Sequence, residues 1–153
     1  MKPILIICLG NPLMRDEGIG IRLASKLSVQ LADNPNVEVL DLGTCTMSAM
    51  HVIAGRKKVI FIDCAIMGQP PGTIRRFGPR DVRSLKVRMR YSMHEGDLIN
   101  ILELSRSLGE CPDDIIIFGI EPKEIAHGEG LSRELENNIQ QYVQVIMNEL
   151  DRT

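Results

Sequence analysis

The sequence predicts an α/β protein with a mainly parallel central sheet covered by helices on both faces. Short, wholly apolar runs such as Ile4–Leu9 are typical of strands buried on both sides. Amphipathic stretches come between these runs, and strands that alternate with helices indicate a parallel sheet. The 153 residues contain no internal repeat, low-complexity tract or long linker. We therefore expect a single domain over residues 1–153.

The first half of the chain supplies three expected strands and one helix. The apolar run Ile4–Leu9 is the first strand. An amphipathic helix follows, in which apolar residues recur four positions apart at Ile19, Leu23, Leu27 and Leu31. The turn-forming residues 33–36 end this helix. The short segment 37–40 is the second strand, and the apolar run 59–62 is the third.

The second half of the chain supplies an edge strand, two helices and a further buried strand. The expected order is a turn at 70–72, an edge strand near 73–77, a helix from the capping box Ser92–Glu95 to Gly109, a strand at 115–118 and a closing helix after Ser132. The same alternation of strand and helix therefore continues along the chain.

Composition excludes several classes of partner. With 18 basic and 20 acidic residues the formal net charge is -2, and aromatic residues make up only 3% of the chain, so nucleic-acid binding is not expected. No apolar stretch approaches the roughly 20 residues of a membrane-spanning helix. The four cysteines are scattered and form no CxxC pair. We therefore expect reduced thiols and a cytoplasmic location.

Acidic side chains follow the first strand, in the segment Gly10–Gly20. Ligands of such sheets bind beyond the carboxyl ends of the strands, so this segment is a candidate site. It contains no phosphate-binding glycine motif, and Asp16 and Glu17 would repel a phosphate. Two adjacent acids suit a cation or a proton transfer. Alternatively, they only favour the N-terminus of the following helix.

Two other segments present possible ligands at strand ends. Asp63 directly follows the third strand, where we expect it to be partly buried and to need a partner, although it could also cap the next turn. His94 lies in the first turn of a predicted helix, which favours the neutral imidazole that binds metals. Two carboxylates and one imidazole would form a mixed set that suits Ni, Zn or Fe(II) and leaves coordination positions open.

The segment Gly10–Gly20, GNPLMRDEGIG, resembles the N-terminal signature of the hydrogenase maturation endopeptidases, which process the large subunit of [NiFe] hydrogenases. The resemblance covers nearly the whole chain, through residues 41–44, 61–66, 71–73, 92–94 and 130–132 in the same order. It implies a three-layer α/β/α sandwich. It also implies an endopeptidase that removes the C-terminal extension of the large-subunit precursor after nickel insertion.

The same resemblance assigns roles to residues. It implies that Glu17, Asp63 and His94 contact the metal and are catalytic, with Asp16 in a supporting role. The nickel would arrive with the substrate, so no permanently bound cofactor is expected. The metal could polarise the scissile carbonyl or activate water, or it could only hold the tail while a carboxylate acts as general base.

A glycine-rich loop of the family would bind the substrate tail. It corresponds here to Gly43 and Thr44, with Leu42 where many relatives carry another glycine. The departure at Leu42 bears on the flexibility of this loop.

Two other functions compete with this one. The first is a non-proteolytic nickel-binding chaperone or sensor that uses the same ligands. The second is a cysteine hydrolase that uses Cys64 or Cys45 with His94. The second is disfavoured, because Asp63 would raise the pKa of the adjacent thiol and no nucleophile elbow is visible.

A basic stretch runs through residues 75–90. Its members are Arg75, Arg76, Arg80, Arg83, Lys86, Arg88 and Arg90. Such a stretch is either a solvated face or a docking surface for the hydrogenase large subunit.

Overall fold

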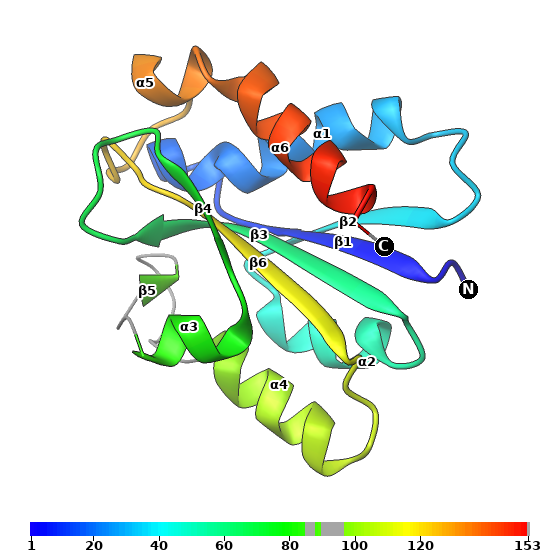
Figure 1. The fold of residues 1–153 in the computed structure, drawn as a ribbon. Coiled ribbons are helices and arrows are strands. Elements are labelled where there is room, and N and C mark those ends of the chain that lie inside the picture. Colours follow the sequence, from blue (N-terminus) through cyan, green and yellow to red (C-terminus); the bar gives the residue numbers. More distant parts are fainter. Residues whose placement is uncertain (85–87, 90–96, 153) are drawn as a thin grey trace.

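The computed structural model describes residues 1–84, 88–89 and 97–152, and a central sheet organises them (Figure 1). The strand order is β2-β1-β3-β6-β4, and β5 pairs with the end of β3. The strands are β1 (Ile4–Leu9), β2 (Val37–Gly43), β3 (Lys58–Ile66), β4 (Ile74–Phe77), β5 (Arg88–Met89) and β6 (Asp114–Ile120). The helices are η1 (Arg15–Gly18), α1 (Ile19–Gln30), η2 (Thr46–Ser48), α2 (Ala49–Ile53), α3 (Pro79–Ser84), α4 (Asp97–Ser107), α5 (Arg133–Glu136) and α6 (Ile139–Leu150).

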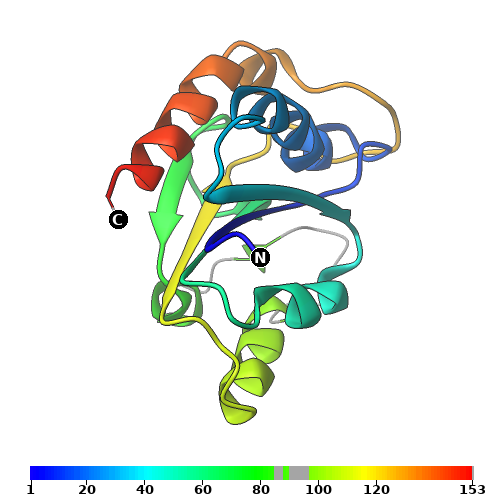
Figure 2. The same ribbon diagram turned by 90° about the vertical axis from the view of Figure 1, so that its right-hand side faces the viewer.

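The sheet is mainly parallel, as the sequence predicts. Strand β1 pairs in parallel with β2 and β3, and β3 pairs in parallel with β6. Strand β4 pairs antiparallel with β6 at the edge of the sheet, so the expected edge strand is confirmed. Helices α1, α5 and α6 cover one face and α2, α3 and α4 the other (Figures 1 and 2). The three-layer α/β/α arrangement is therefore confirmed.

The core consists of two apolar clusters, one on each face of the sheet. Along β1 the side chains alternate: Ile6 and Cys8 face α1 and α6, whereas Leu5 and Ile7 face α2 and α4. Both faces of β1 are thus buried, which explains its continuous apolar run. Cys8 is buried, and all four cysteines are free thiols.

Strands β2 and β3 are both longer than the sequence predicts. Strand β2 continues to Gly43 and β3 to Ile66. The extra residues of β3 are held by β6 and β5, because Cys64 pairs with Ile120 and Ala65 with Met89. Backbone pairing with neighbouring strands therefore extends these strands past the end of the hydrophobic pattern.

The helices also differ from the predicted ones. The closing helix is two helices, α5 and α6, and the side chain of Asn138 between them donates to the carbonyl of Glu134. Apolar spacing did not reveal η1 or α3. Helix α4 is described from Asp97, so the predicted capping box at Ser92 lies outside the described residues. No helix in the described ranges has the length and apolar character needed to cross a membrane.

Candidate functional site

The loop after β1 lies at the carboxyl end of the parallel strands, beside the end of β2. The Gly10 N–H donates to the Gly43 carbonyl at 2.9 Å, which joins the two strand ends. A side chain at position 10 would collide with the Glu17 carbonyl, because that backbone packs directly on Gly10. The Asn11 N–H donates to the same Glu17 carbonyl at 3.0 Å. The tight loop therefore holds the Glu17 backbone against the end of β1.

The glycines of this segment allow close packing. A side chain at Gly20 would collide with the Leu9 carbonyl, so α1 lies directly on β1. This approach carries η1 inward, and Asp16 and Glu17 are both completely buried. The predicted acidic loop is thus part of the interior.

Asp16 fastens η1 to the segment that follows β6. Its Oδ2 accepts hydrogen bonds from the N–H groups of Lys123 (2.8 Å) and Glu124 (2.9 Å). Its Oδ1 accepts one from the Ser132 N–H at 2.7 Å. The carboxylate therefore fixes the loop that carries Glu17 relative to residues 123–132. The supporting role in catalysis that the sequence predicts for Asp16 stays a prediction.

Asp63 is completely buried within β3, so its predicted place at a partly exposed rim is wrong. The reason is the extension of β3 to Ile66 by its neighbours. Pairing of β3 with β1 ends at Ile62, so Asp63 is the first residue of β3 beyond that ladder. Its Oδ1 accepts a hydrogen bond from the Cys64 N–H at 2.8 Å.

Several carboxylates gather around Cys64. Burial raises the pKa of its thiol well above the usual range, and the charges of Asp63, Glu17, Asp16 and Glu121 raise that pKa further. Residues from η1, from β3 and from the end of β6 therefore lie within electrostatic reach of one thiol. Because this thiol is buried and held protonated, Cys64 is unsuited to act as a nucleophile.

Sequence reasoning missed Glu121. It is buried directly after β6, and its Oε1 accepts hydrogen bonds from the N–H groups of Met67 (3.0 Å) and Gln69 (2.6 Å). It thereby shapes the loop that leaves β3. The sequence did contain a signal for Glu121. It is an acidic residue directly after an apolar strand, which is the pattern that singled out Asp63.

The other predicted site residues have different outcomes. Gly43 ends β2 with a φ of 56°, a conformation that glycine favours, and Thr44 beside it is exposed. Both lie at the same sheet edge as the loop after β1. His94 lies outside the described residues. Within the described part of the chain, no three His, Cys, Asp or Glu residues form a group that could hold a metal ion, so the three-ligand set stays a prediction.

Part of the basic stretch is engaged in the fold. The Arg75 guanidinium lies over the Phe77 ring, 5.2 Å from its centroid. Arg76 forms an ion pair with Glu149 at 2.7 Å. Arg80 is exposed, and the side chains at positions 83, 86, 88 and 90 lie outside the described set. Docking through this stretch remains a prediction.

Comparison with known proteins decides the family. The HycI family model, described as hydrogenase maturation protease, matches residues 21–149. The chain belongs to the hydrogenase maturation protease family. The resemblance inferred from GNPLMRDEGIG is thereby confirmed.

Individual family members agree with this assignment. The hydrogenase expression/formation protein HupD of Thiocapsa roseopersicina is 29% identical over 80% of this chain, which spans 55% of HupD. The hydrogenase 2 maturation protease of Escherichia coli K12 is 28% identical over 94% of this chain and 88% of that protein. The solved structure of the hydrogenase maturating endopeptidase HybD from E. coli superposes with a TM-score of 0.84 at 27% identity, covering 99% of this chain and 93% of HybD. The chain thus spans little more than half of HupD but nearly all of HybD.

Proposed function

We propose that this member of the hydrogenase maturation protease family is an endopeptidase that removes the C-terminal extension of a [NiFe] hydrogenase large-subunit precursor after nickel insertion. Membership of the family supports the reaction class. The observation that carries the site is the pair of buried carboxylates, Glu17 and Asp63, which come from different elements and approach the same thiol.

The proposed substrate contact uses Glu17, Asp63 and His94 around the nickel that the precursor brings. Two carboxylates and one imidazole suit a divalent ion of this kind and leave positions for the precursor's own ligands. Chain connectivity supports the inclusion of His94. It lies in the segment between Met89, which pairs with Ala65, and Leu98, which packs in the same apolar cluster as Ala65.

Cleavage can follow either of two routes with these residues. The substrate's nickel can polarise the scissile carbonyl, so that water attacks more readily. Alternatively, the ion only holds the tail while Glu17 or Asp63 removes a proton from water. In both routes the metal-free precursor is a poor substrate, because it lacks the ion that the carboxylates would hold. The enzyme therefore needs no cofactor of its own.

We further propose that Gly43 and Thr44 contact the tail. Their place beside the loop of Glu17 supports this role, since the Gly10 N–H binds the Gly43 carbonyl. We place the reaction in the cytoplasm, and the four free thiols agree with a reducing compartment.

The test is cleavage of purified precursor, followed by intact-mass measurement. We expect the wild-type protein to shorten nickel-loaded precursor and to leave metal-free precursor unchanged. Glu17→Gln, Asp63→Asn and His94→Ala should each lower the cleavage rate by about 10²-fold or more.

Glu110→Gln is the matched control, because this exposed side chain lies just after α4 and should not change the rate. Unchanged mass of the nickel-loaded precursor, with binding retained, would instead identify a nickel-binding chaperone or sensor. Full activity in all three site variants would refute the proposed site.

A further inference from the structure

A groove runs between the edge strand β4 and helix α6, away from the carboxylate site. Its volume is about 420 Å³. Gln141, Val145 and Asn148 line it from α6, at helical spacing along one face, and Arg152 lines it just beyond the end of this helix. Ile74 and Arg76 line it from β4. We call this surface the β4–α6 groove.

Two contacts fix the direction of the groove. At one end the Tyr142 hydroxyl donates to the Gly72 carbonyl at 2.6 Å, just before β4. At the other end Arg76 binds Glu149 at 2.7 Å. Strand β4 and α6 therefore run alongside one another. The four residues of β4 make the groove roughly 13 Å long, which matches about four residues of extended chain.

The outer side of β4 offers backbone groups for an additional strand. Strand β4 is last in the strand order and pairs with β6 through one side. Among residues 1–84, 88–89 and 97–152, no strand pairs with its other side. Exposed strand edges are templates for extended peptides, which bind through main-chain hydrogen bonds while alternate side chains enter pockets.

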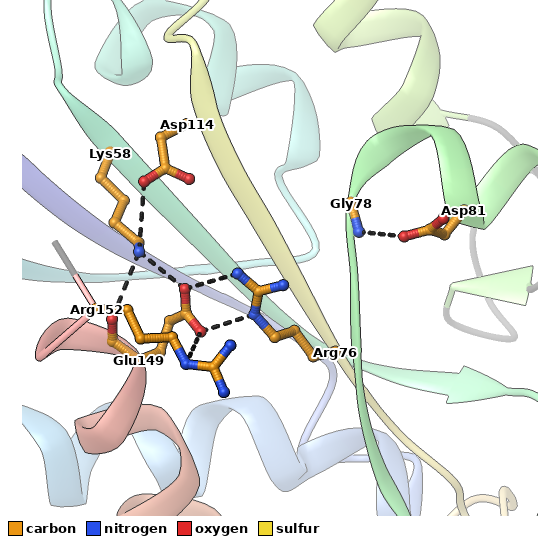
Figure 3. A network of polar contacts seen from close by, with 7 residues as sticks. All are labelled: Lys58, Arg76, Gly78, Asp81, Asp114, Glu149 and Arg152. Atoms are coloured by element: carbon orange, nitrogen blue, oxygen red, sulfur yellow. Dashed lines mark hydrogen bonds and ion pairs between the residues drawn. The ribbon is translucent and has the colours of Figure 1, made fainter.

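The charges around the groove favour an anion at its Arg76 end. Glu149 is already bound by Lys58 Nζ at 2.8 Å and by Arg76 Nε at 2.7 Å (Figure 3). The side chains of Arg76 and Arg152 are nevertheless 41% and 64% exposed. This network holds three basic side chains and two carboxylates, so positive charge is in excess. The basic residues are Lys58, Arg76 and Arg152, and the acidic ones are Glu149 and Asp114.

The other end of the groove has a different character. Ile74 of β4 lines it there, with Val145 of α6 alongside. Ile74 and Arg76 are two residues apart, so they lie on the same face of β4. Side chains two positions apart on an added strand also share one face. An apolar residue two positions from an acidic one would therefore place both side chains on the face that carries Ile74 and Arg76.

We propose that the β4–α6 groove binds an extended acidic segment of a partner protein, which adds to the edge of β4 and carries an apolar residue two positions from a carboxylate. The carboxylate binds Arg76 and Arg152, and the apolar side chain lies over Ile74 and Val145. This surface is separate from Glu17 and Asp63, so the proposal does not depend on the proteolytic reaction.

The test uses a fluorescently labelled, end-capped peptide, Thr-Val-Thr-Glu-Thr-Thr, and measures its anisotropy with the full chain. We expect saturable binding that weakens about ten-fold or more when Glu in the peptide is replaced by Gln. The peptide Thr-Val-Glu-Thr-Thr-Thr, in which the apolar and acidic residues are adjacent, should weaken similarly. Arg152→Glu in the protein should lower affinity about ten-fold or more.

Arg106→Glu is the matched control, because it makes the same charge change on α4, across the sheet. Hydrogen exchange gives a second measurement, and the backbone amides of β4 should exchange more slowly when the peptide is bound. Absence of saturable binding, equal binding of the three peptides, or unchanged affinity of Arg152→Glu would overturn the proposal. Binding without protection of β4 would also overturn it.

Discussion

Asp16 and Glu17 are adjacent buried acids in η1, yet their surroundings differ. Both oxygens of Asp16 accept backbone N–H groups from the segment after β6. Glu17 belongs to η1, which contacts β3, and its charge raises the pKa of the Cys64 thiol. One residue therefore holds the loop in place, and the other is the one we propose to contact the substrate.

We expect Asp16→Asn to destabilise the protein by about 1–3 kcal/mol, because an amide nitrogen replaces one of the two accepting oxygens. Urea unfolding of the metal-free protein measures this loss directly. Glu17→Gln should lose cleavage with a much smaller change in stability. Equal stability of Asp16→Asn and wild type would contradict the anchoring role.

The contacts of Asp16 and Asp63 also show what the sequence could not reveal. The acidic pair at 16–17 was recognisable, but the partners of Asp16 are 107 to 116 residues away and follow no pattern. The burial of Asp63 depends on pairing with β6 and β5, which lengthens β3 beyond its apolar run. The main elements were predictable, in contrast, because each apolar run or helical repeat is local.

Among the secondary-structure elements, the contact of helix α1 with strand β1 sets the position of η1. Gly20 begins this contact, since the Leu9 carbonyl occupies the space that a side chain would need. Helix propensity alone favours alanine over glycine by about 1 kcal/mol. The packing of the helix on the strand opposes this preference.

We therefore expect Gly20→Ala to destabilise the protein by about 2 kcal/mol or more, because α1 must move away from β1. Ser28→Ala, at an exposed position of the same helix, is the control and should be neutral or slightly stabilising. Thermal unfolding of both variants gives the comparison. A stabilised Gly20→Ala protein would show that the helix can shift without cost.

Across the whole molecule, ionisable side chains occupy both ends of the central strand β3. Strand β3 begins at Lys58, which is buried with Glu149 of α6, and carries Asp63 near its other end. Burial acts to raise the pKa of Glu149, but hydrogen bonds from Arg76 and Lys58 outweigh it and hold this pKa below its usual range. The ionised carboxylate therefore binds α6 to the sheet.

A lowered pKa in the folded state contributes stability above the unfolded pKa of about 4.3, and this stability is lost as pH falls through the folded value. We expect Glu149→Gln to lose about 3 kcal/mol at pH 7, because the buried Lys58 then keeps only the half-exposed Asp114, 3.4 Å away, as a carboxylate partner. The difference from wild type should shrink below about pH 4. Urea unfolding at several pH values measures it, with exposed Glu129→Gln as control. A difference that stays constant with pH would contradict this account.

The pairing of Lys58 with Glu149 also has a consequence for the order of events during synthesis. The two residues are 91 positions apart. At about 5–20 residues per second, the ribosome adds Glu149 roughly 5–18 s after Lys58. Until then the half-exposed Asp114 is the carboxylate within reach of the Lys58 ammonium group, and its buried partner is missing. The corner of the sheet at Lys58 can therefore close fully only after α6 has been made.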